Sequence, residues 1–344
     1  MNTTTRLSVG VDLGGTKTEL VVLAHQPDLD DSVIHRERVA TPNGSYTAIL
    51  DTIEALFRHA ESTLSLAWGQ TIRFTNLGVG APGTTIPNTG LIKNANTVCL
   101  IGQPLQADLS QRLNIPVRVE NDANCFTLSE ATDGAAKAKK VVFGVILGTG
   151  VGGGLCINGQ LLNGCHGVAG EWGHNPLPRG AKETSEGLTT YPPRACYCGL
   201  HDCIETYLSG SGFVKTFTDH VNASPLSLQK QHPSNLHLRQ SHAKLSAIDV
   251  IELSQAGNAL AIQALSLYAR QLAQSLAAVV NIIDPDAIVL GGGMSNVQAL
   301  YPLVKQAIQR DVFTDDFDTP ILQAKFGDSS GVRGAAWLGA TQKR

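Results

Sequence analysis

The sequence predicts an α/β fold of two lobes, and three observations support this prediction. The chain has 344 residues, more than one hydrophobic core usually supports. Hydrophobic residues make up 42% of the chain and charged residues only 16%, so a large core can be buried. Each half also carries a glycine-rich turn between two apolar runs, at residues 12–17 and 148–154. Two such turns suggest two related lobes.

The expected elements alternate between strands and helices along the chain. Helical spacing of apolar residues indicates helices, and short apolar runs that end at glycine or proline indicate strands. In the first half we expect strands at residues 7–12, 19–23, 77–81 and 117–120, and helices at 46–67, 105–113 and 123–134. In the second half we expect a strand–turn–strand unit at 141–157, a strand at 287–290, helices at 258–283 and 297–310, and a glycine loop that leads into a helix at 327–338.

Two segments are expected to be loops. Residues 177–195 are rich in proline, glycine, threonine and charge, and residues 220–244 are polar with little periodicity. The second segment holds four of the ten histidines of the chain. Because these histidines are irregularly spaced, a surface insertion is favoured over a metal site.

Composition excludes several classes of protein. The net charge of -3 and the pI near 6.4 argue against a partner that is a nucleic acid or an anionic membrane. No run of eighteen apolar residues occurs, and the first residues do not resemble a signal peptide. Seven cysteines are an odd number for a disulfide framework, so we expect a cytoplasmic protein with reduced thiols and no membrane partner.

The first glycine-rich turn has the residues of a phosphate-binding loop. Gly14 and Gly15 allow backbone N–H groups to face a phosphate, and Thr16 and Lys17 add a hydroxyl and a cation. Asp12, at the end of the preceding strand, could hold Mg²⁺ through water. The alternative is an ordinary hairpin turn. The pattern matches neither a Walker A loop nor the dinucleotide-binding Gly-x-Gly-x-x-Gly that opens a helix.

The second half repeats the pattern and adds a third glycine loop. The predicted phosphate contacts of the second turn are Gly148, Thr149, Gly150, Gly152 and Gly153. The third loop contains Gly292 and Gly293, where the backbone could pass under the base or ribose of a nucleotide. Close packing between a helix and a strand explains the third loop equally well.

Asn121 and Asp122 lie between a predicted strand and a predicted helix. A carboxylate at this position can accept a proton from a substrate hydroxyl while Asn121 orients the same substrate. The alternative is that Asp122 only caps the helix. Together with two phosphate loops, the pair favours Asp122 as the base that activates a hydroxyl nucleophile.

Several polar residues suit a sugar, because vicinal hydroxyls need polar side chains that make several hydrogen bonds. The candidates are Glu171, His174 and Glu205, with Asn94 and Asn96 as weaker candidates. The glutamates could instead be solvated loop residues, the asparagines could form turns, and His174 could serve a metal alone.

A metal site is the most specific pattern in the chain. Three cysteines and one histidine are the donor set of a closed structural zinc site, and they fall within one short stretch: His174, Cys196, Cys198 and Cys203. A disulfide among the three cysteines would leave one thiol over. A catalytic zinc would need an open position, whereas four ligands are already present.

The chain resembles the ROK family (repressor, open reading frame, kinase), most of all its bacterial fructokinases, also called mannofructokinases. Residues 147–155, continued through His174, are similar to the family signature. The other similar stretches are VDLGGTKTE, IKNAN, NDANC, AGEWGHNPLP, CYCG, CIETYLSG, VNIIDPDAIVLGGGMSNV and GDSSGVRGAAWL. The sequence departs from the family in residues 97–101, beside the expected sugar pocket, and in residues 220–244.

This resemblance implies an actin-like ATPase fold, related to ribonuclease H, with two lobes around a central cleft. We expect residues 1–119 and 333–344 to form the small lobe, and residues 120–332 the large lobe with the zinc site. It implies ATP and Mg²⁺ as cofactors besides the structural Zn²⁺, and a homodimer. By position, it implies Asp122 as the catalytic base and Glu171, His174 and Glu205 as sugar contacts. It implies residues 10–17 and 148–154 as phosphate loops, so that Gly10 joins the residues of the first turn named above.

The expected reaction is ATP-dependent phosphorylation of a hexose at its primary hydroxyl, with D-fructose giving fructose 6-phosphate. The alternatives within the family are N-acetylglucosamine or N-acetylmannosamine kinase, and glucokinase or mannokinase. A sugar-sensing repressor of the same fold is disfavoured, because the first strand is expected from about Leu7 and leaves no room for a helix-turn-helix.

Overall fold

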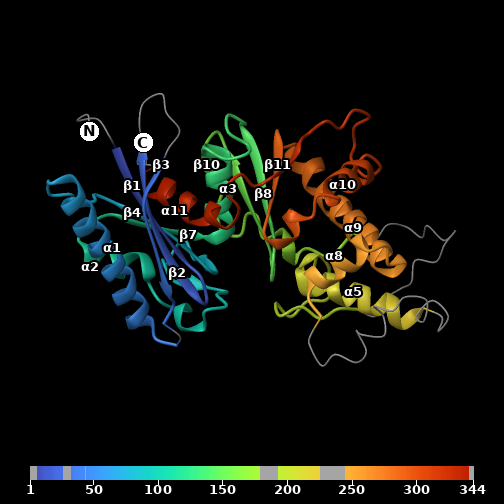
Figure 1. The fold of residues 1–344 in the computed structure, drawn as a ribbon, viewed down its shortest axis with the longest axis horizontal. Coiled ribbons are helices and arrows are strands. Elements are labelled where there is room, and N and C mark those ends of the chain that lie inside the picture. The colour runs from blue at the N-terminus through green and yellow to red at the C-terminus, as the bar shows by residue number, and fades with distance from the viewer. Residues whose placement is uncertain (1–5, 26–31, 43, 179–192, 225–244, 341–344) are drawn as a thin grey trace.

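The computed structural model describes residues 6–25, 32–42, 44–178, 193–224 and 245–340, which form two lobes, each built on a five-stranded sheet. Figure 1 shows the first lobe in blue and teal and the second from green to red. The first sheet has the order β3-β2-β1-β4-β7 and the second β10-β9-β8-β11-β12. In both sheets the first three strands are antiparallel neighbours and the last two join in parallel. The two sheets therefore share one topology, as two related lobes require.

The strand bounds follow the predicted apolar runs closely. The first sheet consists of β1 (Arg6–Leu13), β2 (Lys17–His25), β3 (Ser32–Ala40), β4 (Leu77–Ala81) and β7 (Val117–Asn121). The second consists of β8 (Val141–Leu147), β9 (Val151–Ile157), β10 (Gln160–Leu161), β11 (Ala287–Gly291) and β12 (Ile321–Gln323). A small hairpin joins β5 (Thr84–Thr85) to β6 (Ile92–Lys93).

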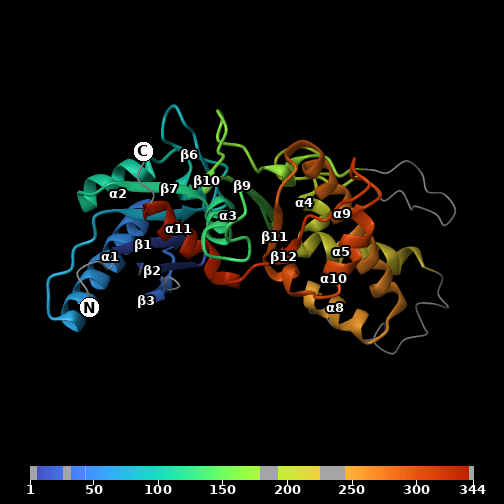
Figure 2. The same ribbon diagram turned by 90° about the horizontal axis from the view of Figure 1, so that it is seen from above.

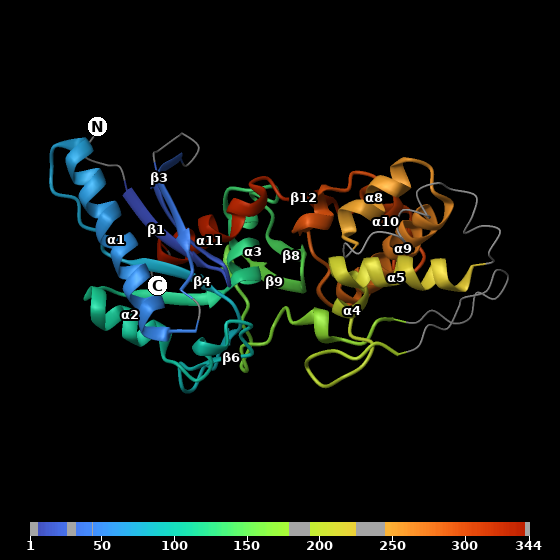
Figure 3. The same cartoon turned by 60° about the horizontal axis from the view of Figure 1, so that its bottom comes forward.

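Helices cover the outer faces of both sheets. The first lobe has α1 (Tyr46–Trp68) and α2 (Leu105–Leu113), and the second has α4 (Glu205–Leu208), α5 (Gly210–Ala223), α8 (Ala247–Gln255), α9 (Ala259–Ile283) and α10 (Leu300–Ile308). Figure 3 shows α5, α8, α9 and α10 gathered at the far end of the second lobe. Each lobe has its own apolar core, one formed by residues 9–119 and the other by residues 143–317.

Two helices cross between the lobes. α3 (Asp122–Thr132) follows β7 of the first sheet but packs on β8 and β9, and α11 (Ser330–Ala340) follows β12 of the second sheet but packs on β1 and β4. Figures 1 and 2 show α3 and α11 side by side between the two sheets. Their backbones approach so closely that a Cβ added at Gly334 would lie 1.6 Å from the Cys125 carbonyl oxygen. The two helices also share one apolar cluster, so the predicted boundaries at residues 119 and 333 stay a prediction.

The structure corrects the sequence-based elements in a few places. The strand β3 was not expected, because it is a mostly exposed edge strand with several charged residues. The strand β12 and the helices α5 and α8 were not expected either. The helix expected from residue 297 begins at Leu300, after a short 3-10 turn at Gly293–Asn296. Residues 220–223, expected as loop, close α5 instead. Residues 179–192 and 225–244 of the two expected loops lie outside the described residues. No helix in the described part of the chain is long and apolar enough to span a membrane.

Candidate active site

Asp122 lies where β7 ends and α3 begins. The preceding residue caps the helix: Asn121 Oδ1 accepts from the Ala123 N–H at 2.9 Å, and Asn121 Nδ2 donates to the Gly83 carbonyl at 2.9 Å. The capping role is therefore filled by Asn121, which also ties α3 to the turn after β4. Asp122 accepts a second, 2.8 Å bond from the same N–H and its side chain remains exposed. The structure thus leaves Asp122 available to a ligand.

The surroundings of Asp122 favour its protonated form. Protein atoms around the carboxylate limit its hydration and raise its pKa above the ordinary value, the Ala123 N–H lowers that pKa, and the charge of Glu171 raises it. Glu171 Oε1 in turn accepts a 3.2 Å hydrogen bond from the Thr84 hydroxyl of the other lobe. The two carboxylates therefore face one region between the lobes.

Asp12 approaches Asp122 from the end of β1. Burial raises the pKa of Asp12 to about 7, with further increases from the charges of Asp122 and Glu19, while Arg38 lowers it. Gly80 and Gly331 leave room on two sides, since a Cβ added to either would lie 3.5–3.6 Å from the Asp12 carboxylate oxygens. Two adjacent carboxylates of raised pKa form a site that suits a divalent cation or a proton.

The first glycine turn is closed by a 2.9 Å bond from the Gly14 N–H to the Lys17 carbonyl. Gly15, Thr16 and Lys17 are all exposed at its tip. Gly10 has a different environment, because a Cβ there would lie 2.2 Å from the Ala336 nitrogen of α11. Packing of the helix on the sheet accounts for glycine at that position without a ligand.

The second turn is held by Glu205. Its Oε2 accepts a 2.9 Å hydrogen bond from the Val151 N–H and would lie 2.6 Å from a Cβ added at Gly150. The Gly148 carbonyl accepts a 2.8 Å bond from Gly210 N–H at the start of α5. Glu205, predicted as a sugar contact, therefore supports the turn that we predicted to bind phosphate.

The other predicted loop residues divide into open and packed positions. Thr149 is exposed and Gly148 has open space, whereas Gly152 lies against Ala123 and Gly153 against the Trp172 ring. In the third loop, Gly292 has φ 76° and packs on the Leu147 carbonyl, while Gly293 is exposed with nothing near. Of the two interpretations of the third loop, close packing fits Gly292 and backbone access fits Gly293.

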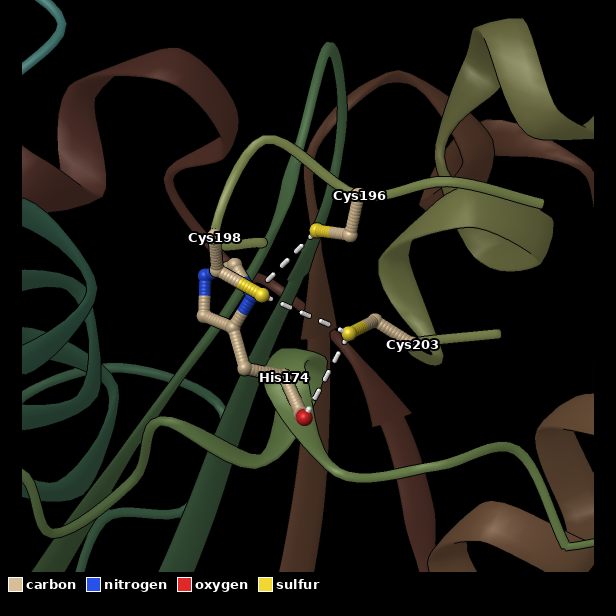
Figure 4. Close-up of side chains that lie close together, drawn as sticks. All are labelled: His174, Cys196, Cys198 and Cys203. Carbon is tan, nitrogen blue, oxygen red and sulfur yellow. Dashed lines mark hydrogen bonds between the residues drawn. The ribbon is translucent and has the colours of Figure 1, made fainter. Parts of the chain in front are cut away.

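Four donor atoms converge beside this site (Figure 4). The ligand atoms of His174, Cys196, Cys198 and Cys203 all lie within 4.8 Å of one another, although the sequence separates them by up to 29 residues. The Cys198 and Cys203 sulfurs are 3.6 Å apart, and Cys196 Sγ is 3.6 Å from His174 Nδ1. A tetrahedral zinc with ordinary bond lengths needs ligand separations of about 3.5–3.8 Å. All four side chains are free of disulfides, so the donor set and its spacing fit Zn²⁺.

The backbone around this cluster is closely paired. Cys196 N–H donates to the Leu200 carbonyl at 2.8 Å, which closes a tight turn. The segment after His174 pairs with the segment around Cys203, through bonds from Ile204 N–H to Asn175 and from Leu177 N–H to Asp202. A metal at this cluster would therefore join the segment of Glu171 to the segment of Glu205.

His174 and Tyr197 are in direct contact at the exposed side of the cluster. The Tyr197 hydroxyl is 3.0 Å from His174 Nε2, and the two rings are nearly perpendicular. Partial burial and the charges of Glu205 and Glu171 raise the pKa of Tyr197 to about 12. Tyr197 was not among the predicted site residues, although its place between Cys196 and Cys198 was a signal that could have indicated it.

Asn96 lies near the first glycine turn. It is exposed and accepts a long, 3.5 Å bond from the Thr97 hydroxyl, which lies beside Gly15 of the first glycine turn. Asn94 has φ 56°, the left-handed conformation expected of a turn residue. The structure thus places Asn96 at the first turn, and brings Asp12, Asp122 and Glu171 together between the lobes.

The duplicated sheet, the crossing helices and the paired glycine turns define the actin-like ATPase fold. The chain belongs to the ROK family, whose family model matches residues 8–342. It is 37% identical over 332 residues, 96% of this chain and 99% of the relative, to an N-acetyl-D-glucosamine kinase of Escherichia coli O139:H28.

Two solved structures of the same family are similar over nearly their whole length. A ROK hexokinase from Thermus thermophilus has a TM-score of 0.76 and 26% identity, covering 97% of this chain and 98% of that one. A ROK glucokinase from Streptomyces griseus, solved with glucose and AMPPNP, has a TM-score of 0.71 and 28% identity, covering 97% and 99%. The actin-like ATPase fold predicted from the sequence is therefore confirmed.

Proposed function

We propose that this protein is a sugar kinase that transfers the γ-phosphoryl group of ATP to the primary hydroxyl of a hexose. The position of Asp122 carries the proposal. Its carboxylate is close enough to Asp12, at the start of the first glycine turn, and to Glu171, three residues before His174 of the Cys₃His cluster, for their charges to interact. A phosphoryl donor and a sugar would meet at such a carboxylate.

In this proposal Asp122 is the general base. Its raised pKa suits a group that must accept a proton from a weakly acidic hydroxyl as the oxygen attacks phosphorus. The exposed turn tips at Gly15–Lys17 and at Thr149 would bind phosphate oxygens through N–H groups, with Lys17 adding a cation. Asp12 would hold Mg²⁺ through water, and that ion would neutralise charge on the transferred group.

The sugar would lie on the side of Glu171, His174 and Glu205. Carboxylates accept hydrogen bonds from vicinal hydroxyls, and exclusion of water between the lobes would prevent hydrolysis of ATP. The Cys₃His cluster would hold Zn²⁺ in a structural role, because its four donors complete a tetrahedron and leave no open position.

The relatives favour N-acetyl-D-glucosamine as the sugar over D-fructose, which the sequence resemblance had put first. The relative described above carries the name N-acetyl-D-glucosamine kinase and aligns over 96% of this chain. D-Fructose stays as the second candidate because of the stretch around residues 280–297, which resembles bacterial fructokinases.

A coupled assay that follows ADP release tests the proposal. The purified protein is mixed with ATP, Mg²⁺ and, one at a time, N-acetylglucosamine, N-acetylmannosamine, glucose, mannose and fructose. We expect sugar-dependent ADP release, with a product phosphorylated at the primary carbon by mass spectrometry and phosphorus NMR. If no sugar of the panel raises ADP release above the sugar-free rate, the proposal fails. The ranking of kcat/KM decides between the acetylated hexosamine and fructose.

A further inference from the structure

We propose that Tyr197 is a sugar-binding residue whose hydroxyl donates a hydrogen bond to a sugar oxygen, beside Glu171 and Glu205. This inference rests on the function proposed above and extends it to a residue outside the predicted site. It concerns how the sugar is recognised, and assigns Tyr197 no part in proton or phosphoryl transfer.

The first observation is where the ring stands. Tyr197 lies between two cysteines of the cluster and is 77% exposed. One edge of the ring contacts the His174 imidazole, with 5.2 Å between the ring centroids, and the rest of the ring is open to a ligand. The ring is nevertheless held in place, because its neighbours Cys196 and Cys198 are fixed by the tight turn of the cluster.

The second observation is the direction of the hydroxyl. It lies 3.0 Å from His174 Nε2, and the His174 N–H donates to the Glu171 carbonyl at 3.2 Å, so the phenol lies beside the turn that carries Glu171. Glu205 follows Cys203 of the same cluster by two residues. The phenol therefore points to the same region as the three side chains predicted to bind sugar.

The third step concerns the hydrogen atoms. His174 Nδ1 faces the sulfur of Cys196 at 3.6 Å, so Nδ1 is the nitrogen on the cluster side. In a metal-bound imidazole the other nitrogen carries the hydrogen, so Nε2–H donates to the Tyr197 oxygen. The phenol hydrogen is then free to be donated elsewhere. Tyr197 thus supplies a donor in a region where Glu171 and Glu205 supply only acceptors.

This combination matches the chemistry of a sugar. Each hydroxyl of a sugar can donate one hydrogen bond and accept others. A hydroxyl that donates to a carboxylate can accept from the phenol, and the exposed ring can cover C–H groups of the sugar ring. Tyr197 would then add one hydrogen bond and one apolar contact to the predicted sugar site.

The test is the conservative variant Tyr197→Phe, which removes the hydroxyl and keeps the ring. Loss of one hydrogen bond to a neutral partner should raise the KM for the sugar roughly 3- to 10-fold, with kcat and the KM for ATP little changed. Tyr197→Ala, which also removes the ring, should raise the sugar KM further. The matched control is Tyr46→Phe, whose hydroxyl donates to Asp108 at 2.7 Å in the first lobe.

A set of monodeoxy analogues of the preferred sugar identifies the oxygen. The analogue that lacks the contacted hydroxyl should be bound equally by wild type and Tyr197→Phe. Zinc content, measured on both proteins by elemental analysis, should be equal. A sugar KM within twofold of wild type for Tyr197→Phe would overturn the inference, as would a KM increase that appears only together with loss of zinc.

Direct binding separates this inference from the proposed function. Calorimetric titration with the sugar, without ATP, measures the affinity of wild type and Tyr197→Phe. If the wild type binds sugar without transferring phosphate, the kinase proposal fails, and weaker binding by Tyr197→Phe still supports the role of Tyr197. If the wild type is an active kinase and Tyr197→Phe binds sugar equally well, only the inference about Tyr197 fails.

Discussion

At the scale of single residues, Asn121 and Asp122 divide two tasks that a lone aspartate at a helix start would combine. Asn121 accepts a hydrogen bond from the Ala123 N–H in the first turn of α3 and holds the turn at Gly83. Asp122 is therefore not needed as the helix cap, and its surroundings raise its pKa. The same separation explains why the sequence left capping and catalysis as alternatives for Asp122.

Replacement of Asp122 by asparagine should reduce kcat about 10²- to 10⁴-fold, the usual contribution of a general base. The helix stays capped by Asn121, so the melting temperature should change little. Steady-state kinetics and thermal unfolding measure the two effects. Asp51→Asn, an exposed carboxylate that pairs with Arg112 on the first lobe, is the control. Turnover close to wild type in Asp122→Asn would remove this residue from the mechanism.

Asp12 should make the stability of the metal-free protein depend on pH. Its pKa is about 7 in the folded protein and near 3.8 in the unfolded chain, so the folded state holds the proton more tightly. Stability contributed by this proton is present below about pH 4 and is lost as the pH rises to 7. The shift of about three pKa units sets an upper limit of about 4 kcal/mol.

Asp12→Asn should therefore raise the melting temperature at pH 8 and leave it almost unchanged at pH 4, in the presence of a chelator. Millimolar Mg²⁺ should stabilise the wild type at pH 8 more than the variant, if Asp12 holds the ion. Thermal unfolding at both pH values, with and without Mg²⁺, measures this. An equal effect of the substitution at pH 4 and pH 8 would contradict the raised pKa.

At the scale of elements, the metal cluster connects two parts of the site. Cys203 is followed at once by Ile204, which pairs with Asn175, and by Glu205, which bonds to Val151 of the second glycine turn. His174 closes the short turn that begins at Glu171. The cluster thus fixes one predicted sugar ligand on each side and, through Glu205, supports a predicted phosphate loop.

Removal of one ligand should loosen both sides together. Cys198→Ala should lower the zinc content from about one ion per chain, and raise the KM for the sugar and, through Glu205, the KM for ATP. Elemental analysis and kinetics measure these outcomes. Cys165→Ala is the matched control, because Cys165 is an exposed free cysteine outside the cluster. Unchanged zinc in Cys198→Ala would refute the ligand assignment.

At the scale of the whole molecule, α3 and α11 couple the lobes. Each helix follows a strand of one sheet and packs on the other sheet, and they meet through glycine rather than bulky side chains. Polar contacts join them as well, since Ser330 Oγ donates to Glu130 at 2.6 Å and Arg333 pairs with Asp133. Any movement of one lobe relative to the other must therefore pass through this pair of helices.

A methyl group at this crossing should be costly. Gly334→Ala would place a Cβ 1.6 Å from the Cys125 carbonyl oxygen, so the backbones must separate. We expect a loss of about 1–3 kcal/mol or more in the free energy of unfolding, measured by denaturant titration. In Gly331→Ala, one turn earlier, the nearest atom would be an Asp12 oxygen at 3.5 Å. Equal stability of Gly334→Ala and wild type would contradict the close approach.

The sequence predicted most elements and missed several, among them β3, β12, α5 and α8. The short apolar run at residues 77–81 and the helical spacing of apolar residues at 258–283 can be recognised in the sequence alone, and the structure has β4 and α9 there. β3 has alternating charged residues and little apolar content, and becomes a strand only because β2 offers an edge for pairing. The helix α10 begins later than predicted, because a 3-10 turn at residues 293–296 precedes it.

The sequence by itself determined the chemical types at the site: two glycine turns, a carboxylate after a strand, and three cysteines with a histidine. Such patterns depend on residue identity and short spacing, which the chain fixes directly. Only the tertiary structure decided that Gly10 and Gly292 serve packing, that Glu205 supports a loop, and that Tyr197 contacts His174. These roles arise from contacts between segments far apart in the chain, and burial and distance have no local signature.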